Sequence, residues 1–210
     1  MPRRLAGSGA WPGRRAARGF TMIELLVTIT LLVLLIGLGL PSFMTWIRNT
    51  QVRSVAESLA TGIRQAQTDA LRLNRSVIFY LTNTAPSPAA IVPAVANGRN
   101  WALLRIPQFG DPTTAADRFI AGGVLTDVAS NVQITAASTA TCFNANGRVA
   151  DNAATGVAGA TTCTAGTRQF DITQTGADRS LRVLVALGGQ IRMCDPGRPV
   201  LSATSPDGCP

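Results

Sequence analysis

An apolar run near the amino terminus constrains this chain more than any other feature. From Met22 to Leu40 the run contains a single charged residue, Glu24. At about 1.5 Å per residue, a helix of that length spans most of the roughly 30 Å hydrocarbon core of a bilayer. Five arginines and no acid precede it, so the positive-inside rule keeps residues 1–18 in the cytoplasm and exports the chain after Pro41. The sequence therefore predicts a single-pass membrane protein.

An ordinary secretory signal peptide is the alternative interpretation. The run is longer than the usual apolar region of about 7 to 15 residues. Its end, Leu40-Pro41-Ser42-Phe43-Met44, also has no small-x-small cleavage site. We therefore expect the apolar segment to stay in the mature chain.

The charged residues argue against catalysis. All 19 basic residues are arginine, and the chain has no lysine or histidine. The carboxylates are scattered singly, and Asp111-Pro112 and Asp195-Pro196 are typical of turns. Because nucleophile and base pairs then have few possible members, we expect no enzyme and no cofactor. Without the five leader arginines, 14 arginines face 11 acids, and this charge of +3 does not by itself indicate nucleic-acid binding.

Four cysteines lie after the apolar run: Cys142, Cys163, Cys194 and Cys209. In an exported domain such cysteines form disulfides that persist. Counting leaves three pairings open, and proximity in the sequence favours Cys142 with Cys163 and Cys194 with Cys209. A metal site is the competing interpretation, but the chain has no histidine and no CxxC pair, so we expect no metal.

The helical pattern continues beyond Pro41. Apolar residues recur every three or four positions at Val52, Val55, Leu59, Ile63, Ala66 and Ala70. This spacing predicts one buried face of an amphipathic helix. We expect one helix from Met22 to about Leu73, with a membrane half over 20–41 and an amphipathic half over 42–74.

The remainder, 75–210, has the pattern of an antiparallel β domain. Runs rich in β-branched and aromatic residues predict strands at 75–82, 100–106, 131–136, 141–143, 168–173, 180–187 and 190–194. The tract 144–166, rich in Ala, Thr and Gly, is expected to be a loop. The predicted fold class is α+β, a long helix packed on an antiparallel sheet with a disulfide-stapled C-terminal region.

The last two strands form a hairpin whose register can be predicted. A two-residue loop would set Val185 opposite Arg192, whereas a loop of Gly188, Gly189 and Gln190 sets Leu187 opposite Ile191 and keeps apolar residues together. We predict the three-residue loop. Arg182 and Arg192 then share the outward face of the hairpin.

The segment Gly19-Phe20-Thr21-Met22-Ile23-Glu24-Leu25-Leu26-Val27 resembles the processing signal of type IV pilins and type II secretion pseudopilins. The resemblance implies that a prepilin peptidase removes residues 1–19 as a leader by cutting after Gly19 and methylates the new terminus at Phe20. It also implies that Glu24 pairs with the amino terminus of a neighbouring subunit and so favours filament assembly. A carboxylate that simply stays at the headgroups is the alternative.

The later segments narrow the resemblance. RSVAESLATGIRQAQTDALRLNRSVIF, CFNANGRVA and RSLRVLVALGGQIRMCDP resemble the GspH/FimT group of minor pilins and pseudopilins. The tail CDPGRPVLSATSPDGC resembles FimT-like members of this group more than GspH-like members. The resemblance implies a structural minor pilin of a type IV pilus. Before assembly the subunit is anchored in the inner membrane with its C-terminal domain in the periplasm, and it then assembles with other pilin subunits. A GspH-like pseudopilin of type II secretion is the alternative.

Some FimT-like proteins bind DNA through a C-terminal Gly-Arg-x-Arg. The matching positions here are Gly189, Gln190, Ile191 and Arg192, so glutamine replaces the first arginine. Glutamine can hydrogen-bond a phosphate but releases no counterion. Candidate DNA contacts are Arg192 and Gln190 together with Arg182 or Arg198. The alternative is that these are solvated strand arginines.

Overall fold

The computed structural model describes residues 19–200, 202 and 204–210. The chain divides into two compact units, Met1–Pro41 and Ser42–Pro210. Helix α1 extends from Met22 to Leu73, as predicted, and belongs to both units. The predicted leader, residues 1–19, lies outside the described part except for Gly19.

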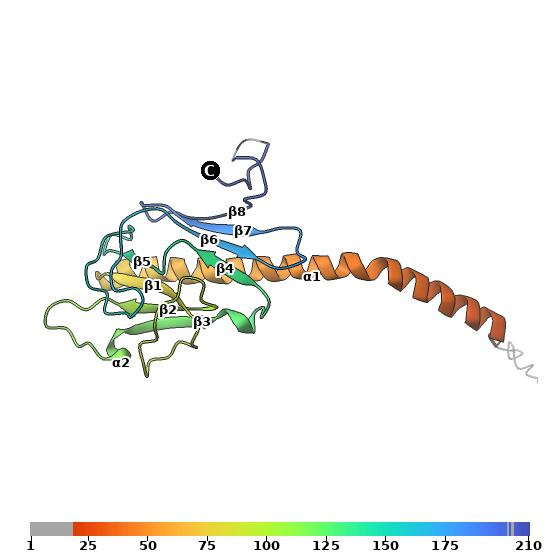
Figure 1. Ribbon diagram of the computed structural model, residues 1–210, viewed down its shortest axis with the longest axis horizontal. Helices are drawn as coiled ribbons and strands as arrows, with labels where there is room; N and C mark the ends of the chain where they lie inside the picture. The colour runs from red at the N-terminus through yellow and green to blue at the C-terminus, as the bar shows by residue number, and fades with distance from the viewer. Residues whose placement is uncertain (1–18, 201, 203) are drawn as a thin grey trace, which may run out of the picture. The chain divides into compact units, whose positions relative to one another are not determined.

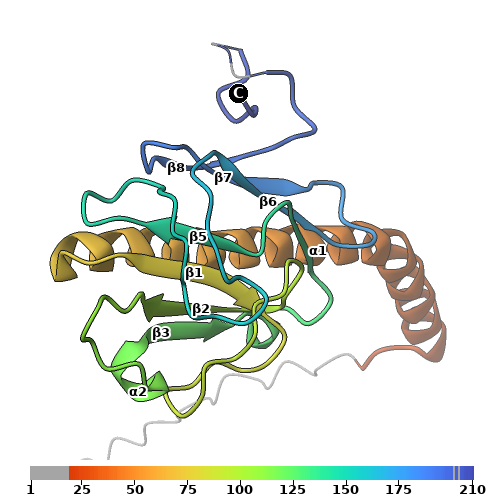
Figure 2. The same cartoon turned by 60° about the vertical axis from the view of Figure 1, so that its left-hand side comes forward.

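In the described residues after the helix there are eight strands, and they form two antiparallel sheets where we expected one. The first sheet has the order β3-β2-β1-β5, with β1 at Val77–Thr82, β2 at Asn100–Arg105, β3 at Phe119–Val124 and β5 at Ala140–Phe143. The second has the order β4-β6-β7-β8, with β4 at Gln133–Ala136, β6 at Arg168–Thr173, β7 at Leu181–Val185 and β8 at Ile191–Cys194. The α+β class is confirmed, with the strands divided between two sheets (Figures 1 and 2).

Strand β3 was not predicted. It contains Gly122 and Gly123, residues that weaken strand propensity. Both glycines are nevertheless needed, because an added Cβ would lie 2.4 Å from Trp101 Nε1 at Gly123 and 2.3 Å from Pro86 Cγ at Gly122. Two short helices flank this strand, α2 at Ala115–Arg118 and the 3₁₀ helix η1 at Leu125–Asp127.

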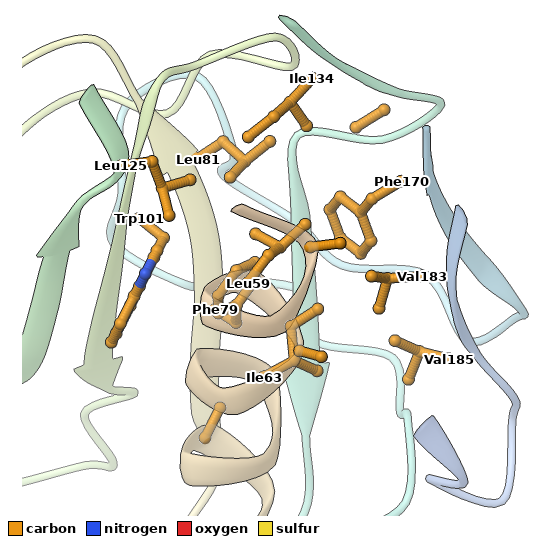
Figure 3. Packing of buried hydrophobic residues seen from close by; sticks show 14 of the residues in the cluster. Leu59, Ile63, Phe79, Leu81, Trp101, Leu125, Ile134, Phe170, Val183 and Val185 are labelled. Atoms are coloured by element: carbon orange, nitrogen blue, oxygen red, sulfur yellow. The ribbon is translucent and has the colours of Figure 1, made fainter. Parts of the chain in front are cut away.

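The amphipathic half of α1 packs against both sheets. All six residues of the predicted apolar stripe are at most 1% exposed. They pack with Phe79 and Trp101 of the first sheet and with Phe170 and Val183 of the second (Figure 3). Gly62 lets the helix approach closely, since a Cβ there would lie 2.8 Å from Trp101 Cε2. One shared core therefore joins the helix to both sheets.

A second apolar cluster covers the other face of the first sheet. Ile78, Tyr80 and Leu104 lie beneath Val157 and Ala160 of the long loop after β5. Because β1 is then buried on both faces, all six of its residues are inaccessible to solvent. Both clusters lie entirely within the unit Ser42–Pro210.

The β7–β8 hairpin differs from its predicted register. Val185, and not Leu187, lies opposite Ile191. Odd-numbered residues of β7 still face odd-numbered residues of β8, as predicted, so the apolar residues share one face. The three loop residues are Leu187, Gly188 and Gly189, closed by the Ala186 N–H donating to Gln190 O at 2.9 Å. Gly189 has φ +89°, and the last residue of such a loop adopts this left-handed conformation. The predicted loop would have placed Gln190 there, where a Cβ is strained.

Candidate functional site

Thr21 caps the start of helix α1. Its Oγ1 accepts a hydrogen bond from the Glu24 backbone N–H at 3.2 Å, and its backbone oxygen accepts from Leu25 N at 3.1 Å. Glu24 is thus in the first helical turn, where the helix dipole favours a carboxylate. Our sequence reasoning missed the role of Thr21. The Thr-x-x-Glu spacing, which is that of a capping box, was the available signal.

Every residue of α1 before Pro41 is exposed. The segment is long and apolar enough to cross a membrane, and none of its most apolar window is buried. Met22 is 89% exposed and Leu38 82%. A continuous apolar surface of this kind needs lipid or other apolar helices to cover it.

The predicted processing residues are accessible. Gly19 and Phe20 precede the first residue of α1 and are both exposed, and a Cβ added at Gly19 would meet no atom within 4 Å. Proteases bind their substrates as extended, exposed peptides. Cleavage of the bond between Gly19 and Phe20 stays a prediction.

Ion pairs hold two of the predicted DNA-contacting arginines. Arg182 on β7 and Asp171 on β6 lie opposite each other, with Arg182 Nη2 at 3.2 Å from Asp171 Oδ2. Arg198 Nε lies 3.4 Å from Asp207 Oδ2 and 3.9 Å from Asp195 Oδ2. Both guanidinium charges are therefore neutralised locally.

The other two predicted DNA contacts lie at the β7–β8 hairpin. Arg192 is half-buried, lies opposite Leu184 and shares the outward face with Arg182, as predicted. Among the described residues it has no carboxylate partner. Gln190 is exposed, and its backbone oxygen is used in closing the hairpin. The structure thus leaves Arg192 as the one unpaired cation of the four residues.

Two disulfides join the cysteines, Cys142 to Cys163 and Cys194 to Cys209, the pairing that sequence proximity favours. The first links β5 to the long loop that covers the first sheet. The second closes the tail onto the end of β8.

Within the described part of the chain no group of three or more possible metal-ligating side chains occurs.

Two arginine clusters were missed by sequence reasoning. Asp111 accepts from Arg75 at 3.0 Å and from Arg105 at 3.1 Å. Arg118 is 3% exposed and donates to the backbone oxygens of Arg105 and Gly156, each at 3.1 Å. Burial lowers the pKa of Arg118 and raises the pKa of Tyr80 to about 12. Asp111 and Arg118 thus fasten loops to the first sheet, and only the folded chain brings them to their partners.

Comparison with known proteins places these features in a family. The motif described as the prokaryotic N-terminal methylation motif matches residues 14–40. The family described as type II transport protein GspH matches residues 55–189, more than half of the chain. The chain belongs to the GspH family. No relative is found among curated proteins.

The solved structures similar to this GspH-family chain include two of a type IV minor pilin and one of a minor pseudopilin. Two crystal forms of the type IV minor pilin FimU from Pseudomonas aeruginosa PAO1 are 14% and 15% identical and have TM-scores of 0.46 and 0.48. The alignments cover 71% and 73% of this chain and 98% and 95% of FimU. The minor pseudopilin EpsH of the Vibrio cholerae type 2 secretion system is 12% identical with a TM-score of 0.42, covering 70% of this chain and 99% of EpsH.

Family membership gives the general function. This GspH-family chain is a minor pilin or pseudopilin, a structural subunit of a type IV pilus or of a type II secretion system that assembles with other such subunits. The methylation motif coincides with the apolar helix, as in a subunit anchored in the inner membrane. The matched families are structural and not enzymatic.

Proposed function

We propose that the chain enters a filament by moving its apolar helix from the inner membrane into a bundle of similar helices. The observation that carries this proposal is that the apolar part of α1 before Pro41 is exposed throughout and has one carboxylate, Glu24, in its first turn. Lipid covers such a helix before assembly, and neighbouring helices cover it afterwards. Residues 1–19 act as the cytoplasmic leader, 20–41 as the membrane anchor, 42–74 as the helix packed on the sheets and 75–210 as the periplasmic β domain.

In this proposal Glu24 makes the apolar helix favour a bundle of similar helices over lipid. After cleavage between Gly19 and Phe20, it lies four residues from a new amino terminus, near the membrane boundary. The free-energy cost of placing its charge there is below the roughly 3 kcal/mol of a charge at the centre of a transmembrane helix. The cationic terminus of a neighbouring subunit, methylated or not, pairs with it in a medium of low dielectric constant.

The test separates membrane insertion from assembly. Glu24→Ala should insert and be processed like the unaltered chain but be depleted from sheared filaments, because the apolar bundle then lacks the pairing charge. Glu57→Ala, which removes an exposed acid from the other half of α1, is the matched control. Normal incorporation of Glu24→Ala would refute the proposed role, whereas failed insertion would refute the anchoring step.

For the host filament, we infer a type IV pilus. The supporting feature is the FimT-like tail, closed between Cys194 and Cys209. A deletion strain should lose surface pili and twitching while still exporting enzymes. A strain that keeps its pili and fails in enzyme export would assign the chain to type II secretion.

DNA contact is a second candidate, favoured by the unpaired Arg192 beside the hairpin loop. Because Arg182 and Arg198 pair with acids, DNA binding at this site rests on a single cation. The binding constant should then depend steeply on salt only if other arginines also contact phosphates. A gel shift at low salt should weaken for Arg192→Ala and not for Arg64→Ala, an exposed helix arginine. Equal shifts for the two variants would remove the hairpin as the DNA site.

A further inference from the structure

A polar hollow of about 380 Å³ opens beside the first turns of α1 in the unit Ser42–Pro210. Two arginines line it, Arg48 of α1 and Arg99 just before β2. Its other described lining residues carry hydroxyl or amide side chains, among them Asn131, Gln133 and Gln174, and none is a carboxylate. A second hollow of about 210 Å³ shares Arg99 and Gln133 with it.

Tertiary contacts hold one wall of this hollow in place. Arg48 Nη1 donates to Gly176 O at 3.3 Å, and Gln174 Nε2 donates to Gln51 Oε1 at 2.7 Å. The Asp178 N–H donates to Asn49 Oδ1 at 3.0 Å. The connection between β6 and β7 is therefore fastened to residues 48–51 of α1, and the two lie side by side (Figures 1 and 2).

Neither of the two arginines pairs with a carboxylate of the described chain. Arg182, Arg198 and Arg75 each pair with an aspartate, whereas Arg48 and Arg99 have no carboxylate partner among the described residues. Two guanidinium groups facing one hollow attract an anion, and their planar donors suit phosphate oxygens. Hydroxyl and amide groups nearby can complete the hydrogen bonding.

The position along the chain indicates where such a phosphate comes from. Arg48 lies eight residues after Leu40, the last residue of the apolar run, which is about 12 Å along a helix. The polar layer of a bilayer extends roughly 5 to 8 Å beyond its hydrocarbon core, and the long stem of an arginine side chain bridges a few ångströms more. Phe43 and Trp46 stack with ring centroids 5.9 Å apart and are exposed, as aromatic residues at a membrane interface are.

We propose that the Arg48–Arg99 hollow binds the phosphate of an anionic phospholipid headgroup while the chain is anchored in the membrane. The inference rests on the proposed membrane anchoring of residues 20–41. The bound headgroup orients the folded unit on the bilayer and is released when the subunit leaves the membrane. This adds a lipid site to a chain otherwise described by its contacts with other subunits.

The test uses the full chain in nanodiscs of phosphatidylcholine with a minor fraction of phosphatidylglycerol. Lipids that stay bound to the protein are counted by native mass spectrometry after release from the disc. We expect the unaltered chain to retain phosphatidylglycerol in preference to phosphatidylcholine. In Arg48→Gln/Arg99→Gln this preference should fall by roughly fivefold for each arginine removed, the contribution of one arginine near anionic lipid.

A matched control removes the same charge elsewhere. Arg64→Gln/Arg148→Gln replaces two exposed arginines outside the hollow and should keep the preference. Equal loss in both double variants would reduce the effect to net charge and overturn the proposal, as would retention by Arg48→Gln/Arg99→Gln. If that variant misfolds, Arg99→Gln alone changes an exposed side chain and should show the single-arginine loss.

Competition distinguishes the possible sources of phosphate. Inorganic phosphate or a short DNA duplex at low millimolar concentration should leave the lipid preference largely intact. Complete displacement by phosphate would show a small-anion site, and displacement by DNA a nucleic-acid site, and each would overturn the lipid assignment. Resistance of the protein to alkaline extraction from vesicles measures anchoring separately, so failure of the anchor is distinguished from failure of the hollow.

Discussion

Gln67 of helix α1 donates from its Nε2 to the backbone oxygen of Gly189 in the β7–β8 hairpin, at 2.9 Å. The same nitrogen donates to the oxygen of Gly147 at 2.8 Å, in the turn after β5. The Val149 N–H in turn donates to Leu187 O at 3.1 Å. One partly buried amide thus joins the helix to turns that belong to the two different sheets.

Replacing this amide should destabilise the folded unit. Gln67→Leu removes the donor of two backbone oxygens and should lower the free energy of unfolding of a Ser42–Pro210 fragment by about 1 to 3 kcal/mol. Gln65→Leu, at an exposed position on the same helix, should change it by less than about 0.5 kcal/mol. Urea denaturation of the two fragments measures the difference, and identical midpoints would contradict the role of Gln67.

The adjacent glycines of the hairpin loop should respond very differently to alanine. At Gly189, φ is +89° and a Cβ would lie 2.1 Å from Gly147 O, so Gly189→Ala should cost about 2 to 4 kcal/mol. At Gly188 a Cβ would meet nothing within 4 Å, and Gly188→Ala should be nearly neutral. Thermal unfolding of both variants tests the observed register, and a larger loss at Gly188 would argue for another loop.

The two disulfides should differ in the parts of the fold that they stabilise. They close sequence separations of 21 and 15 residues, so chain entropy alone gives each roughly 3 kcal/mol. Replacing Cys142 and Cys163 by alanine should cost more, because it also loosens the loop whose Val157 and Ala160 cover the first sheet. Replacing Cys194 and Cys209 should mainly free the tail.

Limited proteolysis together with thermal unfolding distinguishes these outcomes. Loss of the Cys194–Cys209 bond should expose the tail to cleavage with a smaller fall in melting temperature. Loss of the Cys142–Cys163 bond should lower the melting temperature further and make the segment 144–166 cleavable. The reverse order of melting temperatures would show that the tail contributes to the core.

Acid should destabilise the unit through Asp111. The backbone N–H of Gln108 lowers the pKa of this carboxyl most, desolvation opposes that effect, and the charges of Arg75 and Arg105 lower the pKa further. A carboxyl with a lowered folded-state pKa contributes stability above its unfolded value near 4, and this stability is lost as the pH falls through the folded value. Unfolding midpoints measured from pH 6 to pH 3 should therefore fall.

The variant Asp111→Asn isolates this contribution. It should be less stable than the unaltered fragment at pH 6 and should lose less on acidification, because the titrating group is gone. Asp178→Asn, at an exposed carboxylate of the β6–β7 connection, is the control and should keep the original acid response. Parallel pH profiles for all three fragments would contradict the assignment to Asp111.

Local patterns in the sequence were sufficient for the helix and for most strands. The bounds of α1 agree with the predicted Met22 to Leu73, and the stripe from Val52 to Ala70 is buried as its spacing indicated. Seven of the eight strands overlap predicted runs, while β3 was missed because its two glycines have low strand propensity. The family resemblance, carried by the segment around Glu24, was likewise readable without a structure.

Contacts between distant segments were decided by the fold alone. The division into two sheets, the pairing of Arg182 with Asp171 and the joining of two turns by Gln67 depend on which strands become neighbours. The Arg48–Arg99 hollow likewise combines residues from α1, the segment before β2, β4 and the β6–β7 connection. Apolar periodicity is a property of a few consecutive residues and is visible in the chain, whereas the partner of a charge or an amide is set by packing across long sequence separations. For this reason the apolar helix and its carboxylate could be predicted from the sequence, whereas only the tertiary structure decided which arginines pair with a carboxylate.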